Sequence, residues 1–499
     1  MTLHLGKTLV NALARRWWAH PGRISRLLAT PLFDALWYLR RYPDLDPDLH
    51  LTPAEAARHY LRHGAAEGRD PGPAFSTSGY WAQVRAAGLS LGSENPLLHY
   101  LEAGQKLGLA ALPSFAGARP RTGAPVILFA GHQAQTHVFG AEHSLLHMLD
   151  RADRAGLAVE VVLPQALNPD YLAQVLARAQ RVHLRPYGWR RSRHPADSAS
   201  VAQLAALIAQ TGVVALHQNT AVLDAPLIAA RAAGLPTVVY LRELPAQDPE
   251  LCARLGLTAA DLRVDLLAQA DRFIANSAAV ARWIDAPPGA CLIWPNSIEA
   301  SLFDLAFHPQ TPLRVGLISS NMAKKGLADF LTLARLCATR YPTNSPFCFV
   351  LIGPHSADLA RLSPLPALVR QAGYAAGAGA ALAQLDVVLS LSGFAESFGR
   401  TVYEALAAGR PVICYDRGTP PDLIGAADHL AGQIVPCDDP AAVLTALEKL
   451  LHADHALHAA SQAARARARQ IRQMADAVRD AQLYGPVLHR SDHTQPQRQ

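Results

Sequence analysis

The stretch LSLSGFAESFGRTVYEALAAGRPVICYD, residues 389–416, contains the strongest structural signal in the chain. It begins with an apolar strand that ends near Ser392, continues through a loop that contains a glycine, and enters a helix near Phe398 or Gly399. A second apolar strand begins at Pro411, after a short turn. This order predicts a parallel β-α-β unit, and such units bind ligands where the first strand ends and the helix begins.

The same alternation of short apolar strands and Ala/Leu-rich helices continues through most of the chain. We expect one series of strands at 125–131, 159–164, 213–218, 237–242, 272–277 and 291–296, and a second at 313–320, 347–353, 386–392, 411–416 and 432–436. Nearly continuous apolar strands separated by helices indicate parallel sheets covered on both faces. Because the span is too long for one such sheet, we predict two Rossmann-like, doubly wound α/β domains, 124–297 and 310–455, that face a cleft.

An internal repeat with a period of 40 residues precedes these domains, within residues 31–118. It relates four pairs of residues: His59 and His99, Gly64 and Gly104, Gly68 and Gly108, and Phe75 and Phe115. A period of this length is typical of a stacked supersecondary unit, and the composition predicts short helices, so we expect a small all-α repeat domain. We expect the repeated histidines to pack or cap rather than to bind a ligand, and the Pro- and Gly-rich stretch 113–125 to be a linker.

The composition indicates a folded protein without a nucleic-acid partner. The 499 residues are 50% hydrophobic and 17% charged, and 46 Lys and Arg against 40 Asp and Glu give a net charge of +6. This weak positive charge is compatible with an anionic ligand or a lipid surface. The six cysteines form no CxxC pair, which fits a reducing cytoplasm, and no acidic pair has the setting of a metal site, so we expect no metal and no cofactor.

Both ends of the chain have a polar or basic composition. Residues 1–30 form a basic leader in which Trp17 and Trp18 lie beside arginines, so it is either an amphipathic helix on the inner face of a membrane, a solvated helix, or disordered. We expect no signal peptide, and no apolar run reaches the ~18 residues that span a bilayer. Residues 486–499 are polar and are predicted to be a disordered tail.

The loop and helix of residues 389–416 carry groups suited to a nucleotide-sugar. Backbone N–H groups at Phe398, Gly399 and Arg400 can hold phosphate oxygens, with the helix dipole adding to this attraction. Glu396 can contact a sugar hydroxyl or stabilise positive charge at an anomeric carbon, and Glu404, about two turns later, can accept hydrogen bonds from a ribose diol.

A second candidate lies in VGLISSNMAKKGLADFL, residues 315–331. Lys324 and Lys325 follow a predicted strand and precede a helix. Ammonium groups at such a junction can neutralise a diphosphate leaving group.

These two motifs resemble glycosyltransferase family 4, whose signature contains two glutamates separated by seven residues, here Glu396 and Glu404. The resemblance covers residues 125–485 and implies a GT-B fold, with the acceptor bound by the first domain, the donor bound by the second, and helices 456–485 crossing back onto the first. The family's lysine before glycine matches Lys325. Its arginine five residues earlier is replaced by Ser320, which leaves open whether Lys324 or Arg400 supplies the missing charge.

The same resemblance assigns further residues of the candidate site. The loop with Gly140 is similar to the glycine-rich acceptor-side loop, and we include Gly140 among the donor-binding candidates. His217 matches a histidine that faces the donor sugar, with Asn219 beside it, although a structural histidine is the alternative. Arg242 and Glu243, where related enzymes often have histidine, are acceptor-side candidates, and an ion pair explains them equally well. Gly353 corresponds to the place where the nucleotide base is held.

Together these features predict a retaining glycosyltransferase that moves a sugar from a nucleotide-sugar to a glycan or lipid-linked acceptor. Glu396, His217 and Lys325 are its catalytic candidates. The repeat resembles helical segments beside bacterial polysaccharide-assembly transferases, which indicates surface polysaccharide synthesis in the cytoplasm, with peripheral membrane contact. The alternatives are a nucleotide-sugar epimerase of similar architecture and a non-catalytic scaffold, and Ser320 favours the latter.

Overall fold

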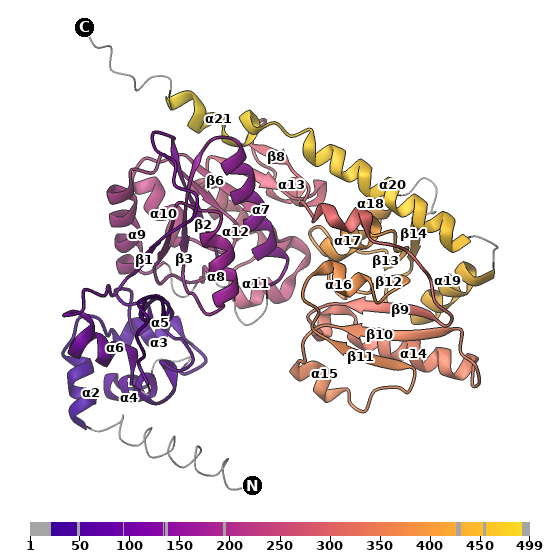
Figure 1. The fold of residues 1–499 in the computed structure, drawn as a ribbon, viewed down its shortest axis with the longest axis horizontal. Helices are drawn as coiled ribbons and strands as arrows, with labels where there is room; N and C mark the ends of the chain where they lie inside the picture. The colour runs from indigo at the N-terminus through magenta and orange to yellow at the C-terminus, as the bar shows by residue number, and fades with distance from the viewer. Residues whose placement is uncertain are drawn as a thin grey trace. The chain divides into compact units, whose positions relative to one another are not determined.

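The computed structural model describes residues 21–46, 50–92, 94–132, 134, 138–192, 196–425, 431–452 and 456–491. Its contacts divide the chain into two compact units (Figure 1). The first unit comprises 1–240, 250–273 and 480–499, and the second comprises 241–249 and 274–479. Residues 1–20 of the expected leader, with Trp17 and Trp18, lie outside the described residues. None of the helices in the described part of the chain combines the length and apolar composition that crossing a bilayer requires.

The first unit begins with the predicted all-α region. After α2 (Pro21–Leu28), two copies of the repeat follow: α3 (Ala35–Arg41), α4 (Pro53–His59) and the π-helix η1 (Tyr60–Gly64), then α5 (Thr77–Ala86), α6 (Pro96–His99) and the π-helix η2 (Tyr100–Gly104). Each of the four α-helices of the repeat begins at a side-chain cap, supplied by Asp34, Thr52, Ser76 and Asn95. Such caps satisfy backbone N–H groups at the start of these short helices, which are otherwise marginal.

The repeated histidines each contact a tyrosine hydroxyl. The Tyr38 hydroxyl lies 2.9 Å from Nδ1 of His59, and the Tyr80 hydroxyl lies 2.7 Å from Nδ1 of His99. Both tyrosines are fully buried. The histidines therefore supply hydrogen-bond partners to buried hydroxyls, in agreement with the expected packing role.

The repeated glycines provide room for the same tyrosines. A Cβ atom at Gly64 would lie 2.0 Å from the Tyr38 hydroxyl oxygen, and one at Gly104 would lie 2.2 Å from that of Tyr80. The close approach of a buried ring to the backbone of the π-helix, rather than a helix end, is what requires glycine here.

The helical repeat is followed by a doubly wound α/β domain built on an eight-stranded sheet. The strand order is β1-β4-β3-β2-β5-β6-β7-β8, formed by β1 (Ser114–Ala116), β2 (Val126–Ala130), β3 (Ala158–Leu163), β4 (Arg181–Leu184), β5 (Ala215–Gln218), β6 (Thr237–Leu241), β7 (Arg272–Ala275) and β8 (Cys291–Ile293). The order from β4 to β7 is that of a Rossmann fold. The helices are α7 (Gly140–Arg154), α8 (Pro169–Leu176), α9 (Ser198–Thr211), α10 (Ala225–Ala232), α11 (Pro249–Leu255), α12 (Ala259–Gln269) and α13 (Ala278–Ile284), with the 3₁₀ turn η3 (Pro245–Gln247).

Every predicted strand is present, but three strands were missed. Strand β1 lies inside the predicted linker 113–125 and pairs antiparallel with β4, so that interpretation of the linker was wrong. Strand β4 reads RVHL, and His183 within it bonds Glu160 at 2.8 Å, a buried polar pair that masks the apolar pattern. The third, β11 (Val369–Gly373), lies at the edge of the second sheet and is largely accessible.

The second unit contains a six-stranded parallel sheet in the order β11-β10-β9-β12-β13-β14. Its other strands are β9 (Leu313–Ile318), β10 (Phe347–Ile352), β12 (Val387–Ser390), β13 (Val412–Tyr415) and β14 (Gly432–Val435), and its helices are α14 (Leu327–Arg340), α15 (Ala357–Arg361), α16 (Ala378–Leu382), α17 (Arg400–Ala407), α18 (Pro420–Ile424) and α19 (Pro440–His452). Separate apolar cores lie on the two faces, one with α14 and α19 and the other with α16 and α17. This arrangement confirms the prediction of a sheet covered on both faces.

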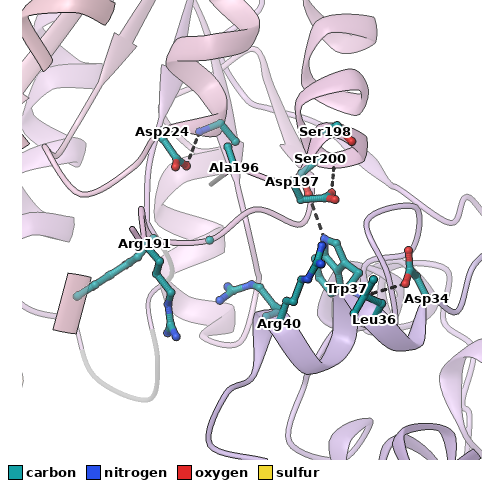
Figure 2. A pocket seen from close by; sticks show the side chains of 14 residues that line it. Asp34, Leu36, Trp37, Arg40, Arg191, Ala196, Asp197, Ser198, Ser200 and Asp224 are labelled. Carbon is teal, nitrogen blue, oxygen red and sulfur yellow. Dashed lines mark hydrogen bonds between the residues drawn. The ribbon is translucent and has the colours of Figure 1, made fainter. Parts of the chain in front are cut away.

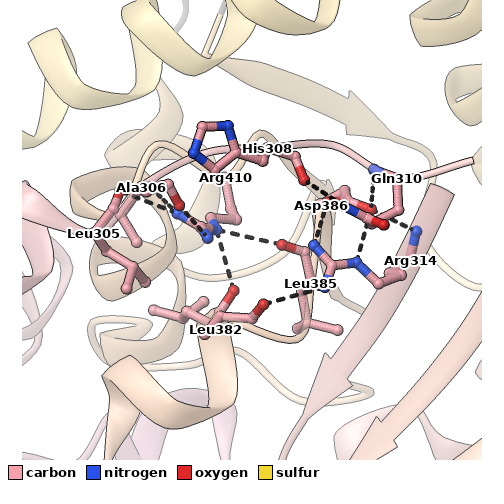
Figure 3. A network of polar contacts seen from close by, with 11 residues as sticks. Leu305, Ala306, His308, Gln310, Arg314, Leu382, Leu385, Asp386 and Arg410 are labelled. Carbon is pink, nitrogen blue, oxygen red and sulfur yellow. Dashed lines mark hydrogen bonds and ion pairs between the residues drawn. The ribbon is translucent and has the colours of Figure 1, made fainter.

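A buried polar network fixes the segment that leads into this sheet (Figure 3). The guanidinium of Arg410, 2% exposed, donates hydrogen bonds to the carbonyl oxygens of Ala306 and Leu382. The fully buried Asp386 accepts hydrogen bonds from the backbone N–H groups of Gln310 and Arg314 and from the Arg314 guanidinium. The segment after η4 (Ala300–Asp304) is thus anchored to the second sheet.

The prediction assigned helices 456–485 to the first domain. The structure divides these helices between the two units. Helix α20 (Ala456–Asp476) is part of the second unit because its residues Ala464, Ala468 and Ile471 enter the core that contains α17. Helix α21 (Asp480–Ser491) is part of the first unit, where Asp480 pairs with Arg151 at 2.8 Å. Helical structure therefore also continues past 486, the predicted start of the tail.

We expect Gly64→Ala to lower the free energy of unfolding by about 1–3 kcal/mol, because the new methyl group would overlap the Tyr38 hydroxyl. The measurement is urea unfolding of the full chain. The double variant Gly64→Ala with Tyr38→Phe removes that hydroxyl and should recover part of the loss, relative to Tyr38→Phe alone. Strictly additive effects would contradict the assigned contact.

Candidate functional site

Two loops at the same edge of the second sheet carry the main candidates. The first follows β9 and contains the short turn η5 (Ala323–Lys325), and the second follows β12. The backbone N–H of Gly393 donates to the Lys324 carbonyl at 2.8 Å, so the loops are joined. Gly326, with φ +78°, has no room for a side chain, because a Cβ atom would lie 2.0 Å from the Leu391 carbonyl oxygen.

This junction brings Lys325 and Glu396 together. Nζ of Lys325 lies 2.8 Å from Oε1 of Glu396, and the Ser392 hydroxyl donates to the same oxygen at 2.6 Å. The Lys325 and Glu396 side chains are 27% and 18% exposed. Burial alone would raise the pKa of Glu396, but the charge of Lys325 and the two hydrogen bonds outweigh it, so the pKa lies below its usual range. Glu396 is therefore a carboxylate at neutral pH.

The two adjacent lysines have different surroundings. Both ammonium groups lie over the ring of Phe394, at 4.8 Å for Lys324 and 4.7 Å for Lys325. Lys324 additionally lies 3.6 Å from a carboxylate oxygen of Asp248, whereas Lys325 contacts Glu396. Lys325 is therefore the lysine in direct contact with the glutamate of the motif.

The second glutamate has a separate partner. Helix α17 begins at Arg400, after Gly399 in a left-handed conformation, slightly later than predicted. Oε1 of Glu404 lies 3.4 Å from the Arg400 guanidinium. Burial raises the pKa of Glu404, Arg400 opposes this, and the charge of Glu299 adds to the rise, so the pKa lies above its usual range. Arg400 thus pairs with Glu404. Its guanidinium is therefore less suited to replace the family's arginine, absent at Ser320, as a cation for the diphosphate.

Two other donor-binding candidates, Phe398 and Gly353, are required by the packing of the second unit. Phe398 is 4% exposed and packs in the core beside α17, so only its backbone remains suited to a ligand. A Cβ atom at Gly353 would lie 2.0 Å from the carbonyl oxygen of Ser319, so glycine allows the ends of β9 and β10 to approach closely. Asn321, next to Ser320, is fully buried and donates to the Pro354 carbonyl at 2.9 Å.

The acceptor-side candidates Arg242 and Glu243 belong to the second unit, beside the loop of Glu396. The Ser397 hydroxyl donates to the Arg242 carbonyl oxygen at 2.6 Å, and the Arg242 guanidinium donates to Oδ1 of Asn296. The backbone N–H of Arg242 donates to a carboxylate oxygen of Glu243 at 3.2 Å. Polar contacts therefore hold Arg242 and Glu243 beside this loop.

Sequence reasoning missed several side chains around this site. Ser392, Phe394 and Ser397 lie within the quoted motif, so their position in the loop was a usable signal. Asp248 contacts Lys324, and the Asn276 amide donates to the Ser397 hydroxyl at 3.2 Å. Neither residue has a sequence signal, because each comes from a segment distant along the chain.

In the first unit, Asn219 contacts the first turn of α7, the helix that begins at Gly140. The Asn219 amide donates to the carbonyl oxygen of Ala141 at 2.9 Å. Glu142 accepts a hydrogen bond from the Phe139 backbone N–H at 3.0 Å and lies 3.1 Å from Nε2 of His132. Burial would raise the pKa of Glu142, but His132 outweighs this and lowers it.

His217 lies in the core, which corrects its expected position facing a donor sugar. Its side chain is fully buried, Nδ1 lies 3.0 Å from the Tyr240 hydroxyl, and its ring stacks on Tyr484 of α21 at 5.5 Å. Burial lowers the pKa of His217 to about 3, with a contribution from Arg272, so the imidazole is neutral. The alternative of a structural histidine at the end of a strand is therefore the one that fits, because α21 covers this face of β5.

The described residues contain no group of three or more His, Cys, Asp and Glu side chains positioned to hold a metal ion.

Family comparisons cover both α/β domains. Residues 138–302 match the model described as Glycosyltransferase Family 4, and residues 312–453 match the model described as Glycosyl transferases group 1, together more than half of the chain. A comparison with curated proteins gives no match.

Solved structures share the fold at low sequence identity. HepE of Anabaena in complex with UDP and glucose is 20% identical, with a TM-score of 0.54, over 70% of this chain and 97% of that one. Sucrose-phosphate synthase of Thermosynechococcus elongatus is 16% identical, with a TM-score of 0.54, over 73% of this chain and 100% of that one. WaaG, a glycosyltransferase involved in lipopolysaccharide biosynthesis, is 14% identical, with a TM-score of 0.51, over 74% of this chain and 99% of that one.

The paired Rossmann-like sheets, the Lys325–Glu396 contact and the two family matches agree with one another. The chain belongs to glycosyltransferase family 4 and has the GT-B fold.

Proposed function

We propose that the protein transfers a sugar from a nucleotide-sugar donor to a glycan or lipid-linked acceptor, with retention of anomeric configuration. The observation that carries the proposal is the 2.8 Å contact between Lys325 and Glu396 at the joined ends of β9 and β12. It places an ammonium group and an ionised carboxylate at the edge of the sheet where such folds bind nucleotides. The structures of HepE with UDP and glucose, and with UDP-glucose, support a nucleotide-sugar donor.

The donor's diphosphate is assigned to Lys325 and to the backbone N–H groups that begin α17. Positive charge at these positions offsets the negative charge that develops on a leaving diphosphate. In this proposal no metal or other cofactor is required. Lys324, whose ammonium lies beside Asp248, is assigned the smaller part, because Lys325 is the lysine that contacts Glu396 of the motif.

The two glutamates are assigned different parts of the donor. Glu396, kept ionised by Lys325, faces the sugar and stabilises positive charge at its anomeric carbon. Glu404, on α17, accepts hydrogen bonds from the ribose hydroxyls. Arg242 and Glu243, beside the loop of Glu396, and Asn219, which bonds Ala141, remain the candidates for the acceptor, and Gly140 remains a donor-binding candidate.

We further propose a role in bacterial surface polysaccharide synthesis, at the cytoplasmic face of the membrane. The involvement of WaaG in lipopolysaccharide biosynthesis supports this role, as does the resemblance of the helical repeat to segments of polysaccharide-assembly transferases. An epimerase would release sugar products without any acceptor, and a scaffold, which the absence of arginine at Ser320 favours, would bind no nucleotide-sugar at all. A panel of nucleotide-sugars tested by saturation-transfer NMR, with and without acceptor, separates the three functions, and the anomeric coupling constant of the product tests retention.

We expect Glu404→Ala to weaken donor binding by at least about tenfold, or about 1.4 kcal/mol, and Glu396→Ala to lower kcat more than it weakens binding. Calorimetry and initial rates, with the donor selected by the panel, measure the two effects. Glu250→Ala, which removes a carboxylate paired with an arginine one helical turn away, is the matched control. Equal and small effects at both sites would contradict the assignment.

Lys325→Ala should lower kcat/KM by an amount that corresponds to about 2–4 kcal/mol of activation free energy. The reason is that the ammonium offsets negative charge that increases in the transition state. Lys324→Ala removes the same charge from the neighbouring position and should cost less. A loss below about tenfold for Lys325→Ala would transfer the role to Lys324 or Arg400.

Donor affinity should fall as the solution becomes acidic, at a pH above the usual range of a glutamate. The reason is that the pKa of Glu404 is raised, so it gains a proton early, and a neutral carboxyl accepts weaker hydrogen bonds from the ribose. Binding of the intact nucleotide-sugar, measured from pH 4 to 8, should show this fall in the parent protein and not in Glu404→Gln. An unchanged profile in Glu404→Gln would exclude Glu404 as its source.

A further inference from the structure

A pocket of about 460 Å³ lies within the first unit, between the helical repeat and the first α/β domain (Figure 2). Helix α3 contributes Trp37, Arg40 and Arg41 to its lining, and the segment after β4 contributes Trp189 and Arg191. The starts of α9 and α10 complete the wall. We call this cavity the repeat pocket. Its residues play no part in the donor site proposed above.

The carboxylates that line the repeat pocket are already engaged. Asp34 accepts a hydrogen bond from the backbone N–H of Trp37, Asp197 from that of Ser200, and Asp224 from that of Ala225. Each of them caps the start of a helix, at α3, α9 and α10 respectively. Their negative charge is therefore largely compensated by backbone N–H groups and by the helix dipoles.

Two of the three arginines that line the repeat pocket have no such partner among the described residues. Within the described part of the chain, neither Arg40 nor Arg191 forms a hydrogen bond or an ion pair. Arg41 donates to the Tyr187 carbonyl oxygen at 3.2 Å, and its charge opposes the rise that burial causes in the pKa of Asp70. Burial lowers the pKa of Arg191, the charge of Arg41 lowers it further, and the charge of Asp44 partly opposes them. The pocket thus gathers three guanidinium groups, at least two of which repel each other.

Aromatic side chains accompany these charges. Trp37 is buried, and its indole N–H donates to the Ser200 hydroxyl at 3.4 Å, which holds the ring against the start of α9. Trp189 also lines the pocket, two residues before Arg191, and the guanidinium of Arg254 lies over its ring at 5.9 Å from the centroid. Indole rings suit the apolar faces of sugar rings, and guanidinium groups bind carboxylates and phosphates in bidentate fashion.

We propose that the repeat pocket binds an anionic saccharide group, a sugar that carries a carboxylate or a phosphate, through Arg40 and Arg191. The oxyanion occupies the position between the unpaired guanidinium groups, and the sugar ring lies toward the indoles. The helical repeat then supplies half of a carbohydrate site that the α/β domain alone does not contain. This site is independent of catalysis, so its existence does not rest on the proposed transfer reaction.

The test measures binding of defined probes to the full chain by calorimetry at low ionic strength. The probes are an oligogalacturonate, glucose 1-phosphate, inorganic phosphate and a neutral maltooligosaccharide. The variants are Arg191→Gln, Arg191→Lys and Arg40→Gln. The control is Arg85→Gln, which removes the same charge from an exposed residue of α5 outside the pocket.

We expect the parent protein to bind at least one of the two anionic saccharides, and to bind the neutral sugar and inorganic phosphate more weakly. Arg191→Gln and Arg40→Gln should each weaken binding by about tenfold, Arg191→Lys by less, and Arg85→Gln hardly at all. Preference for the oligogalacturonate identifies a carboxylate, and preference for glucose 1-phosphate identifies a phosphate.

Three results would overturn the proposal: no binding of either anionic saccharide, binding that both glutamine variants retain, or equal binding of inorganic phosphate. The second of these would place the probe elsewhere, including the donor site. Loss of donor turnover has no bearing on this outcome, so failure of the proposed function remains distinguishable. Thermal unfolding of each variant checks that its fold is retained.

Discussion

The contact between Lys325 and Glu396 depends on the pairing of β9 with β12. These strands are neighbours and parallel, so the loops that follow them leave the same edge of the sheet although they are far apart in the sequence. Gly326 allows the two loops to touch, and the Gly393 backbone N–H joins them. Any change in strand order would separate the ammonium group from the carboxylate, so the candidate donor site depends on the topology of the sheet.

Burial gives the two glutamates of the motif opposite properties. Glu396 has two hydrogen-bond donors at one oxygen, the Lys325 ammonium and the Ser392 hydroxyl, so its pKa falls despite desolvation. Glu404 has a more distant guanidinium and a nearby negative charge, so desolvation prevails and its pKa rises. Two identical residues eight positions apart are thus suited to different tasks, one to permanent negative charge and the other to hydrogen bonding. The neutral, buried His217 contributes to packing under α21 instead.

The helical repeat is integrated with the first α/β domain rather than separated from it by a linker. Strand β1, directly after the repeat, joins the sheet through β4. Trp37 of α3 reaches the start of α9, and the three aspartates of the repeat pocket all serve as helix caps. The carboxylates of the pocket cap helices, whereas Arg40 and Arg191 are left unpaired, and this difference favours an anionic ligand there.

The sequence by itself determined the two α/β domains, the helical repeat and the glutamate and lysine motifs, because apolar periodicity, a fixed repeat spacing and loop chemistry are local properties. It did not reveal β4 or β11, since buried polar pairs and exposed edges break the apolar pattern. Only the tertiary structure decided that Lys325 rather than Lys324 meets Glu396, that α20 and α21 belong to different units, and that His217 is enclosed. Those outcomes depend on which distant segments pack together, and no local pattern encodes such contacts.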